Sequence, residues 1–576
     1  MALSRGARLI LTFVLAAALV SMLGLAAALL VAGRGPTVER DSVLWLRLPP
    51  ALAERSPDDL VGQFFGGRET VGSIVAALRK AKADERIAAV VLVPSVQPGL
   101  WGKVQEIRDA VLDFRESDKP IVAYLEFGQG QAYYLATACD EIFLTPSSPL
   151  NLVGVASYEL FLRGAFDKVG IEADMLAAGD YKTASNLYTE TTFTPEHREM
   201  AASLNRDFFE QLVDGIADGR EMDPAVVRAI IDEGPFLPQD ALRRGLIDAV
   251  VYEDQLLDGL PIPRNAGVVD FARYRQVRPA GVGIGGGPSL GVVFTEGTIN
   301  FGASGAAVTG GRTVGSETWI RALREARDDP GIAAIILRID SPGGVAVAAD
   351  IMWREVVLAR ARKPVIASMS DLAASGGYYI AAPAHAIVAQ PGTLTGSIGA
   401  FGGKFVLGGA LDRFGVNVEA VSDGAQADLF SPATPFSDGA RLALQRQLDA
   451  TYERFLQIVA EGRGMTRDEV HAVAQGRVWT GRQAKARGLV DELGGLRRAV
   501  ELAKEQAGID PEREVTLVPF PRRRSVWEQL QQSVSLASAA AWLTSPAVRE
   551  AAALLGPTEL LVSGAPLLLL PRPAAR

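Results

Sequence analysis

The feature that most constrains the fold of this chain is an internal duplication. Residues 87–92 (IAAVVL) recur as residues 332–337 (IAAIIL). The correspondence continues as far as residues 244–248 (RGLID) and 487–491 (RGLVD), where the spacing is two residues shorter. About 200 residues are therefore present twice, and a chain of 576 residues is long enough to give each copy its own core.

Each copy alternates apolar, β-branched runs with helical stretches, which is the pattern of β-α-β units around a mostly parallel sheet. We expect strands at residues 88–93, 121–124, 333–339 and 365–368, and helices at residues 73–83 and 317–328. The fold class is therefore α/β, with two tandem domains. The expected boundaries are residues 41–262 for the first domain, 263–288 for a glycine-rich linker, 289–510 for the second domain and 511–576 for a C-terminal extension.

The N-terminus carries a membrane signal. Residues 9–33 contain no charged side chain, and a helix of this length crosses a hydrocarbon core of about 30 Å. Arg5 and Arg8 precede the run and favour a cytoplasmic N-terminus. Because the run is longer than the core of a typical signal peptide, we predict one uncleaved transmembrane helix within residues 1–40; a cleaved signal peptide, cut near residues 26–32, is the alternative.

Composition excludes several kinds of chemistry. Asp and Glu outnumber Lys and Arg by 67 to 58, which argues against a nucleic-acid partner. Cys139 is the only cysteine, so the chain has no internal disulfide and no cysteine-based zinc site. Three scattered histidines offer little for a metal cluster or a histidine base, and we expect His385 at the surface. We therefore expect no metal and no cofactor, and a hydrolytic base of another residue type.

The two copies differ where an acyl-transfer site needs special residues. Residues 340–344 (DSPGG) of the second copy correspond to residues 95–99 (SVQPG) of the first, and a Pro-Gly-Gly turn suits an oxyanion hole because its N–H groups face outward unhindered. Ser375 lies among small residues at an expected strand-to-helix turn, and Gly130 takes its place in the first copy. Such a serine suits a nucleophile; the alternative is a serine that caps the helix beginning near Gly376.

Lysine is scarce, with ten residues against 48 arginines, so each lysine is informative. Lys182 lies in residues 177–184 (AAGDYKTA), and Ala427 takes its place in the second copy. Desolvation among small residues lowers the pKa of an amine and favours its neutral form. A neutral Lys182 can then accept a proton from Ser375 as a general base. The first copy lacks the serine and the second lacks the lysine, so side-by-side packing predicts one composite site; an exposed Lys182 is the alternative.

These features together resemble the long form of bacterial signal peptide peptidase A, also called protease IV. The resemblance rests on the N-terminal apolar run, the tandem repeat and the motifs at residues 179–182 (GDYK), 340–344 (DSPGG), 374–378 (ASGGY) and 393–399 (TLTGSIG), and it extends to about residue 510. It implies a Clp-protease/crotonase-like fold, a serine/lysine dyad protease and a membrane-tethered homotetramer that cuts remnant signal peptides. It also implies location in the bacterial inner membrane, with the catalytic domains on the periplasmic side.

The resemblance assigns roles to five residues. Ser375 is the nucleophile, Lys182 the general base, and the N–H groups of Gly376 and Gly344 form the oxyanion hole. Ser397 hydrogen-bonds the lysine amine and orients it, which is physically sensible because a neutral amine needs partners to direct its lone pair. A simple turn serine is the alternative for Ser397.

The expected substrates are extended, apolar peptides that add a strand beside the site. A crotonase-type acyl-CoA enzyme on the same fold is one alternative, but the sequence shows no acidic pair near Gly344 and leaves Lys182 without a role. A membrane-anchored scaffold or pseudoprotease is another, and the presence of both Ser375 and Lys182 argues against it. Residues 511–576 match no motif; an oligomer contact, a membrane-interface element and surface helices remain open for them.

Overall fold

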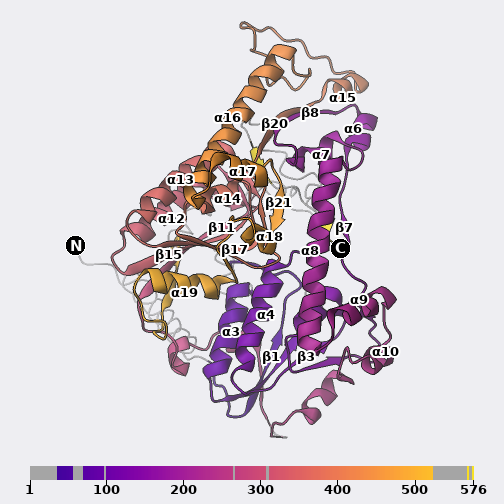
Figure 1. Ribbon diagram of the computed structural model, residues 1–576, viewed down its shortest axis with the longest axis vertical. Helices are drawn as coiled ribbons and strands as arrows, with labels where there is room; N and C mark the ends of the chain where they lie inside the picture. The colour runs from indigo at the N-terminus through magenta and orange to yellow at the C-terminus, as the bar shows by residue number, and fades with distance from the viewer. Residues whose placement is uncertain are drawn as a thin grey trace, which may run out of the picture.

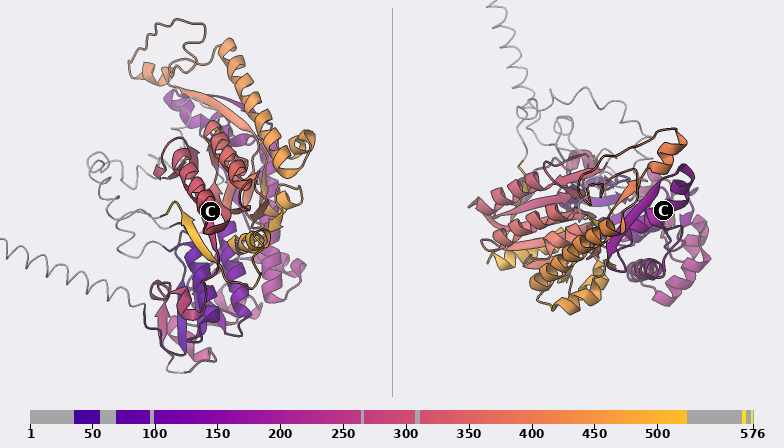
Figure 2. Two further views of the ribbon diagram at one scale, coloured as in Figure 1. Left: turned by 90° about the vertical axis from the view of Figure 1, so that its left-hand side faces the viewer. Right: turned by 90° about the horizontal axis from the view of Figure 1, so that it is seen from above.

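The structure is a computed structural model that describes residues 36–55, 69–95, 99–263, 266–306, 311–522, 567–569 and 574–575. Among these residues, no helix combines the length and the apolar character that a bilayer crossing requires. The transmembrane helix expected at residues 9–33 lies outside the described residues, as does most of the C-terminal extension. In Figure 1 and in the left-hand view of Figure 2, most of the first copy, in indigo to magenta, lies below the second copy, in salmon to orange.

The first copy folds around a six-stranded sheet in the order β10-β1-β2-β3-β5-β9, with every pair parallel. Its strands are β1 (Ser42–Arg47), β2 (Ile87–Val93), β3 (Ile121–Leu125), β5 (Glu141–Leu144), β9 (Ala249–Val250) and β10 (Val268–Asp270). The first helices are α3 (Val71–Ala83), α4 (Gly102–Arg115) and α5 (Gly130–Ala136). α3 begins two residues earlier than residue 73 because Thr70 and Ser73 form a capping box.

The remaining helices and short strands of the first copy follow its sheet in the chain. They are β4 (Gly128–Gln129), β6 (Leu150–Asn151), β7 (Ser157–Tyr158), α6 (Arg163–Val169), β8 (Glu172–Ala178), η1 (Thr183–Ser185), α7 (Asn186–Thr189), α8 (Pro195–Arg220), α9 (Pro224–Glu233), α10 (Pro238–Arg243), η2 (Glu253–Gly259), α11 (Phe271–Tyr274) and η3 (Pro279–Val282). Strand β10 belongs to the segment expected to link the copies, so part of that segment is an edge strand of the first sheet.

The second copy repeats this plan with a sheet in the order β21-β19-β17-β15-β11-β23, to which β18 adds by pairing with β17 and β22 by pairing with β18. Its strands are β11 (Ser289–Glu296), β15 (Ile332–Ser341), β17 (Val365–Ala374), β18 (Ala386–Ala389), β19 (Leu394–Gly396), β21 (Val478–Thr480), β22 (Glu492–Leu493) and β23 (Thr516–Phe520). Its helices are α12 (Ser316–Asp328), α13 (Ala346–Arg360), α14 (Gly376–Ala381), α15 (Gly408–Arg413), α16 (Asp438–Arg463), α17 (Arg467–Val473), α18 (Gly481–Lys485) and α19 (Leu496–Gln506). The α/β architecture is thus confirmed in both copies.

A third sheet joins the two copies. Its order is β13-β14-β12-β16-β24-β20-β8, with β12 (Thr298–Asn300), β13 (Gly305–Ala306), β14 (Arg312–Gly315), β16 (Gly343–Val345), β20 (Ala400–Val406) and β24 (Leu567–Leu569). β8 comes from the first copy but pairs antiparallel with β20 of the second along its whole length, and the two lie side by side at the top of Figure 1. This crossing carries the residues that follow β8 into the second copy.

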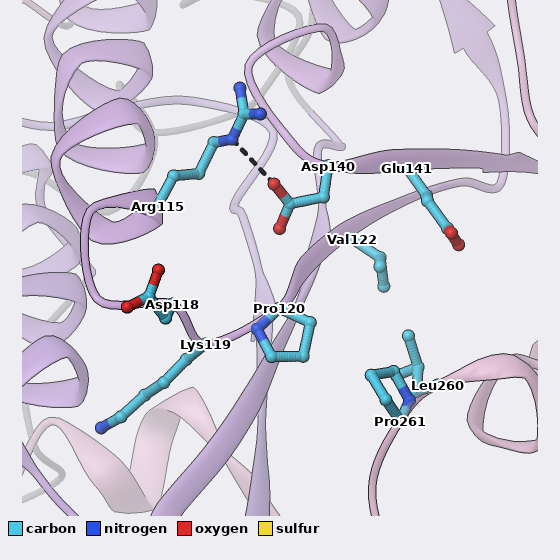
Figure 3. Close-up of a pocket in the computed structure, with 9 residues that line it drawn as sticks. All are labelled: Arg115, Asp118, Lys119, Pro120, Val122, Asp140, Glu141, Leu260 and Pro261. Atoms are coloured by element: carbon cyan, nitrogen blue, oxygen red, sulfur yellow. Dashed lines mark hydrogen bonds and ion pairs between the residues drawn. The ribbon is translucent and has the colours of Figure 1, made fainter.

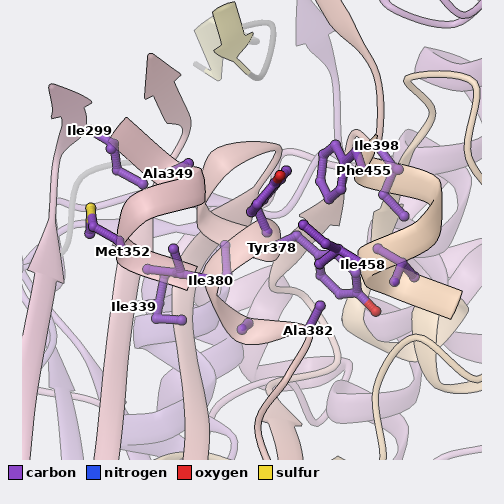
Figure 4. Close-up of a cluster of buried hydrophobic side chains, with 14 of the residues drawn as sticks. Ile299, Ile339, Ala349, Met352, Tyr378, Ile380, Ala382, Ile398, Phe455 and Ile458 are labelled. Atoms are coloured by element: carbon purple, nitrogen blue, oxygen red, sulfur yellow. The ribbon is translucent and has the colours of Figure 1, made fainter. Parts of the chain in front are cut away.

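The buried apolar side chains form one large cluster in each copy, and each cluster continues into the other copy. The cluster of the second copy includes Tyr378 on α14 and Phe455 on α16, shown in Figure 4, and it takes in Tyr188 from the first copy. The cluster of the first copy takes in Ala374 and Leu394 from the second copy. Because close-packed cores transmit strain rather than absorb it, the junction between the copies is a rigid place for a site.

Candidate active site

Ser375 occupies the single position between β17 and α14. Its N–H donates to the carbonyl oxygen of Gly396, at 2.7 Å, which fixes the turn to the neighbouring strand β19. The backbone angles of Ser375 are φ 55° and ψ −114°, a region that residues other than glycine seldom occupy. The side chain makes no capping hydrogen bond to α14. The helix-capping alternative is therefore wrong, and the turn leaves the hydroxyl for another partner.

That partner is Lys182, which the crossing of β8 brings over from the first copy. The Nζ atom of Lys182 lies 2.8 Å from Ser375 Oγ, 2.9 Å from the carbonyl oxygen of Ser397 and 3.0 Å from Ser397 Oγ. The lysine is only 2% exposed, so the exposed alternative is wrong. Burial disfavours the ammonium form and holds the pKa of Lys182 well below its ordinary value.

The three partners of the amine match the hydrogen-bonding capacity of a neutral lysine. A neutral amine has two N–H groups and one lone pair. The carbonyl oxygen of Ser397 can only accept, and Ser397 Oγ can accept the second N–H. The lone pair then faces Ser375 Oγ, which is the arrangement a base needs to take the hydroxyl proton.

The backbone of Ser397 is fixed by a hydrogen bond to the loop that contains Arg477. Its φ is 52°, and its N–H donates to the carbonyl oxygen of Arg477 at 2.7 Å. The Arg477 guanidinium lies near the rings of Tyr181, at 4.8 Å, and Trp479, at 4.4 Å, and forms an ion pair with Glu199 at 2.8 Å. Sequence reasoning expected the Ser397 hydroxyl at the amine but missed the carbonyl, which carries no residue-type signal.

The two glycines expected to form the oxyanion hole lie next to each other. Gly344 is the middle residue of β16, and a Cβ atom there would overlap the carbonyl oxygen of Ile299 on β12, so only glycine fits. Gly376 is the first residue of α14, and a Cβ atom there would lie 3.2 Å from the amide nitrogen of Gly344. Ser375 directly precedes Gly376. The structure thus gathers all five sequence-predicted site residues at one junction.

Sequence reasoning missed Gly476, which packs against the backbone of Lys182. Gly476 has φ 82° and donates its N–H to the carbonyl oxygen of Ile398 at 2.7 Å. A Cβ atom there would lie 2.5 Å from Lys182 Cα and would overlap the Lys182 amide nitrogen. The next residue back, Gln475, accepts the N–H of Tyr181 at 2.8 Å. A single glycine among 59 gives no sequence signal for such a contact.

A buried lysine, Lys103 on α4 of the first copy, holds the two strands that lead into the site. Its Nζ lies 2.7 Å from Asp340 Oδ2 and 3.2 Å from Asp371 Oδ2, and its N–H donates to Asp371 Oδ1 at 2.9 Å. Asp340 precedes the Pro-Gly-Gly turn, and Asp371 lies four residues before Ser375. Folding thus brings together, around Lys103, two carboxylates that are distant in the sequence.

The ionisation of this cluster follows from burial and from its neighbours. Burial raises the pKa of Asp340 to about 6, although Lys103 opposes that rise. Burial also disfavours the Lys103 ammonium, but the facing carboxylates outweigh it and raise the pKa of Lys103. Beside this cluster, Arg338 on β15 binds Glu54 at 2.8 Å and Glu106 at 2.7 Å, both from the first copy. The copies therefore meet through buried ion pairs as well as apolar packing.

Three other kinds of feature could mark a site: a histidine, a metal-binding group and a surface hollow. His385 is exposed between α14 and β18, as expected. Within the described part of the chain, no group of three or more His, Cys, Asp or Glu side chains is placed to hold a metal ion. A surface hollow of about 380 Å³ in the first copy, shown in Figure 3, is bordered by the ion pair of Arg115 and Asp140, and none of the five site residues lines it.

Comparison with known proteins gives the family. Residues 113–264 and 358–510 each match Peptidase family S49. The chain is 36% identical over 493 residues to the chloroplastic serine protease SPPA of Arabidopsis thaliana, covering 84% of this chain and 72% of that protein. It is 33% identical over 456 residues to Protease 4 of Salmonella typhi, covering 75% of this chain and 71% of that protein.

Among solved structures, a membrane-bound stomatin-specific protease aligns with 40% of this chain and 96% of its own, at 16% identity and a TM-score of 0.26. The paired match to one family and the identity over most of the chain assign the family. This chain is a serine protease and belongs to peptidase family S49.

Proposed function

We propose that this protein is a membrane-anchored serine endopeptidase in which Ser375 and Lys182 form the catalytic dyad. The observation that carries the proposal is the 2.8 Å separation of Lys182 Nζ and Ser375 Oγ in a buried junction. This is the reach that a general base needs, and burial supplies the neutral amine. On the sequence resemblance, the fold is assigned to the Clp-protease/crotonase-like class.

The reaction proceeds from this geometry. Ser375 Oγ attacks the peptide carbonyl as Lys182 takes its proton, while Ser397 holds the two N–H groups of the amine. The N–H groups of Gly344 and Gly376 stabilise the oxyanion, and the Lys182 ammonium returns the proton to the leaving amine. Water then hydrolyses the acyl-enzyme by the same route.

The proposed substrates are extended, apolar peptides, including remnants of signal peptides. A protein of Enterococcus faecium named as a signal peptide peptidase is 31% identical to this chain over 191 residues. The uncharged run at residues 9–33 is long enough to tether the enzyme, and a tether raises the local concentration of substrates that leave the bilayer slowly. The resemblance adds a homotetramer in the bacterial inner membrane, with the catalytic domains on the periplasmic side.

The test compares three variants in cleavage of a leucine-rich fluorogenic peptide. Ser375→Ala should remove the activity, and Lys182→Met should lower it by about 10²- to 10⁴-fold, the usual contribution of a general base. Lys80→Met is the matched control, because Lys80 is also buried and has its pKa lowered to about 8, yet its amine donates to backbone carbonyls of residues 274–277 rather than to a site residue.

The Lys80 variant should keep most of the activity, and circular dichroism should show all three variants folded. In cell fractions, the wild-type activity should sediment with the membranes. Wild-type turnover by folded Lys182→Met would overturn the base assignment, and full activity in the soluble fraction would overturn the anchor.

A further inference from the structure

The third sheet contains a position one strand wide beside the catalytic serine. Two strands border this position, β16 and β20. The outer edge of β16 pairs with β12, and the outer edge of β20 pairs with β8. Between the two inner edges, the described residues place only β24, which pairs antiparallel with β16 and with β20. Neighbouring strands lie about 4.8 Å apart, so one extended segment fills this position completely.

This position is the one that a peptide substrate needs. β16 carries Gly344, whose N–H is assigned to the oxyanion hole, and Gly344 lies next to Gly376 and Ser375. A peptide that adds a strand to an exposed edge gains main-chain hydrogen bonds irrespective of its sequence. In the structure this edge is already occupied, because Leu568 lies opposite Gly344.

The occupant comes from the C-terminal end of the same chain. The sequence around β24 is a run of four leucines, residues 567–570, bounded by Pro566 and Pro571. Such a run has the apolar, extended character proposed for substrates. A few residues later β25 (Ala574–Ala575) pairs antiparallel with β7 of the first copy, where Figure 1 marks the C-terminus. The described C-terminal residues therefore pair with strands of both copies.

The burial of the nucleophile agrees with this occupancy. Ser375 is 0% exposed, although a serine protease needs its hydroxyl accessible to substrate. An unpaired strand edge is also a liability that proteins usually cover. A segment tethered within the same chain binds in an intramolecular step, so it competes with free peptides at an effective concentration that dilution does not change.

We infer that residues 567–569 occupy the substrate-strand position of the proposed peptidase, so that the C-terminal leucine run acts as a tethered competitor of extended apolar peptides. This inference rests on the proposed function of the site. It gives residues 511–576, which match no motif, a role at the active site. It also names the ligand class of the position: an uncharged, leucine-rich segment in extended conformation.

The test weakens the strand while keeping the full chain. Leu568→Pro removes an N–H and clashes with strand geometry, whereas Leu568→Ala keeps the backbone able to pair. With a soluble leucine-rich peptide as substrate, Leu568→Pro should lower KM at least fivefold at unchanged kcat. Leu568→Ala should stay within twofold of the wild type. Equal KM values for the wild type and Leu568→Pro would overturn the inference.

A binding experiment separates this inference from the proposed catalysis. In the Ser375→Ala chain, fluorescence anisotropy of the same labelled peptide should show at least fivefold tighter binding when Leu568→Pro is added. This readout needs no turnover, so it holds or fails whether or not the dyad is correct. Equal peptide affinity in the Ser375→Ala chain with and without Leu568→Pro would contradict the inference.

A mass measurement shows whether the leucine run is also cut. Loss of the C-terminal residues from the intact mass of the wild type, but not from that of Ser375→Ala, supports occupancy of the site by the run.

Discussion

Lys182 can act as a base only while it is neutral, and its surroundings stabilise that state. No ion pair with a carboxylate forms at its amine among the described residues, and its three partners are uncharged oxygen atoms of Ser375 and Ser397. Desolvation is the cause of its lowered pKa. A nearby carboxylate would restore the ammonium form, as Asp340 and Asp371 do for Lys103.

This burial makes stability depend on pH in a defined direction. The pKa of Lys182 in the folded protein lies below 10.5, its ordinary value, so between the two pKa values the unfolded chain binds one more proton. The free energy of unfolding of the wild type should therefore rise with pH across that window, relative to Lys182→Met, by up to about 1.4 kcal/mol per pH unit. Urea unfolding from pH 7 to pH 10 measures the difference.

The control is Lys168→Met, because Lys168 is exposed on α6 and meets similar solvent in both states. Its difference from the wild type should stay constant with pH. A difference between wild type and Lys182→Met that is flat from pH 7 to pH 10 would mean that Lys182 keeps its proton in the folded protein.

Residue type alone predicted much of the site. Ser375 and Lys182 stood out because each is replaced by a small residue in the other copy, by Gly130 and Ala427. The left-handed φ of Ser375 and the carbonyl acceptor of Ser397 could not be predicted, because backbone conformation and carbonyl groups are not specific to a residue type.

Among the elements, the loop at residues 475–477 contacts the backbone next to both Lys182 and Ser397. It accepts the N–H of Tyr181, places Gly476 against Lys182 and accepts the N–H of Ser397. One short loop therefore fixes the backbone on both sides of the amine. A displacement of the loop would move the base relative to Ser375.

A side chain at Gly476 should reduce catalysis through the position of Lys182. In Gly476→Ala the new Cβ atom would overlap the Lys182 backbone, so we expect kcat to fall by about 10²-fold, as small misplacements of catalytic groups do. Gly488→Ala is the control, because Gly488 has a similar φ, 74°, but its nearest neighbour would be Met465 Sδ at 3.8 Å. Both variants carry the same left-handed strain. Equal kcat values in the two would show that the loop does not position the lysine.

The buried ion pairs of Lys103 affect stability as well as geometry. Lys103→Met leaves the carboxylates of Asp340 and Asp371 buried without a cation, so the free energy of unfolding should fall by about 3–5 kcal/mol at pH 8. The loss should shrink as the pH falls from 8 toward about 6, because Lys103 holds down the pKa of Asp340 in the wild type, so the variant takes up the Asp340 proton at a higher pH.

Lys82→Met is the control, since Lys82 also bridges two carboxylates, those of Asp113 and Glu116, but at the surface. That variant should lose about 1 kcal/mol or less. Chemical unfolding at pH 5 and pH 8 measures both variants. A Lys103→Met variant as stable as Lys82→Met would show that the buried cluster does not hold the strands.

The same cluster explains why strand lengths were underestimated. β17 was expected to end at residue 368 but continues to Ala374. Its last part contains Ser370 and Asp371, polar residues that interrupt the apolar pattern and therefore predict a loop. In the structure Ser370 donates to Glu54 and Asp371 meets Lys103, so partners from the first copy allow the strand to continue.

At the scale of the whole molecule, the two copies share one site because they exchange structure. β8 of the first copy completes a sheet of the second, and side chains from each copy enter the core of the other. Complementary loss of the serine and the lysine predicted a composite site. The crossing of β8 that builds it could not be predicted, since local sequence patterns do not specify which strands pair.

The exchange within one chain gives a prediction about mixed assemblies. Ser375 and Lys182 are 193 residues apart in the sequence and meet within a single chain. Co-expressed Ser375→Ala and Lys182→Ala chains should therefore remain inactive toward a leucine-rich peptide, even when pull-down of differently tagged chains shows that they assemble. Wild type co-expressed with Ser375→Ala is the control and should keep activity in proportion to its wild-type share. If the two inactive variants restored a quarter or more of the wild-type activity, β8 would have to cross between chains, as in a domain swap.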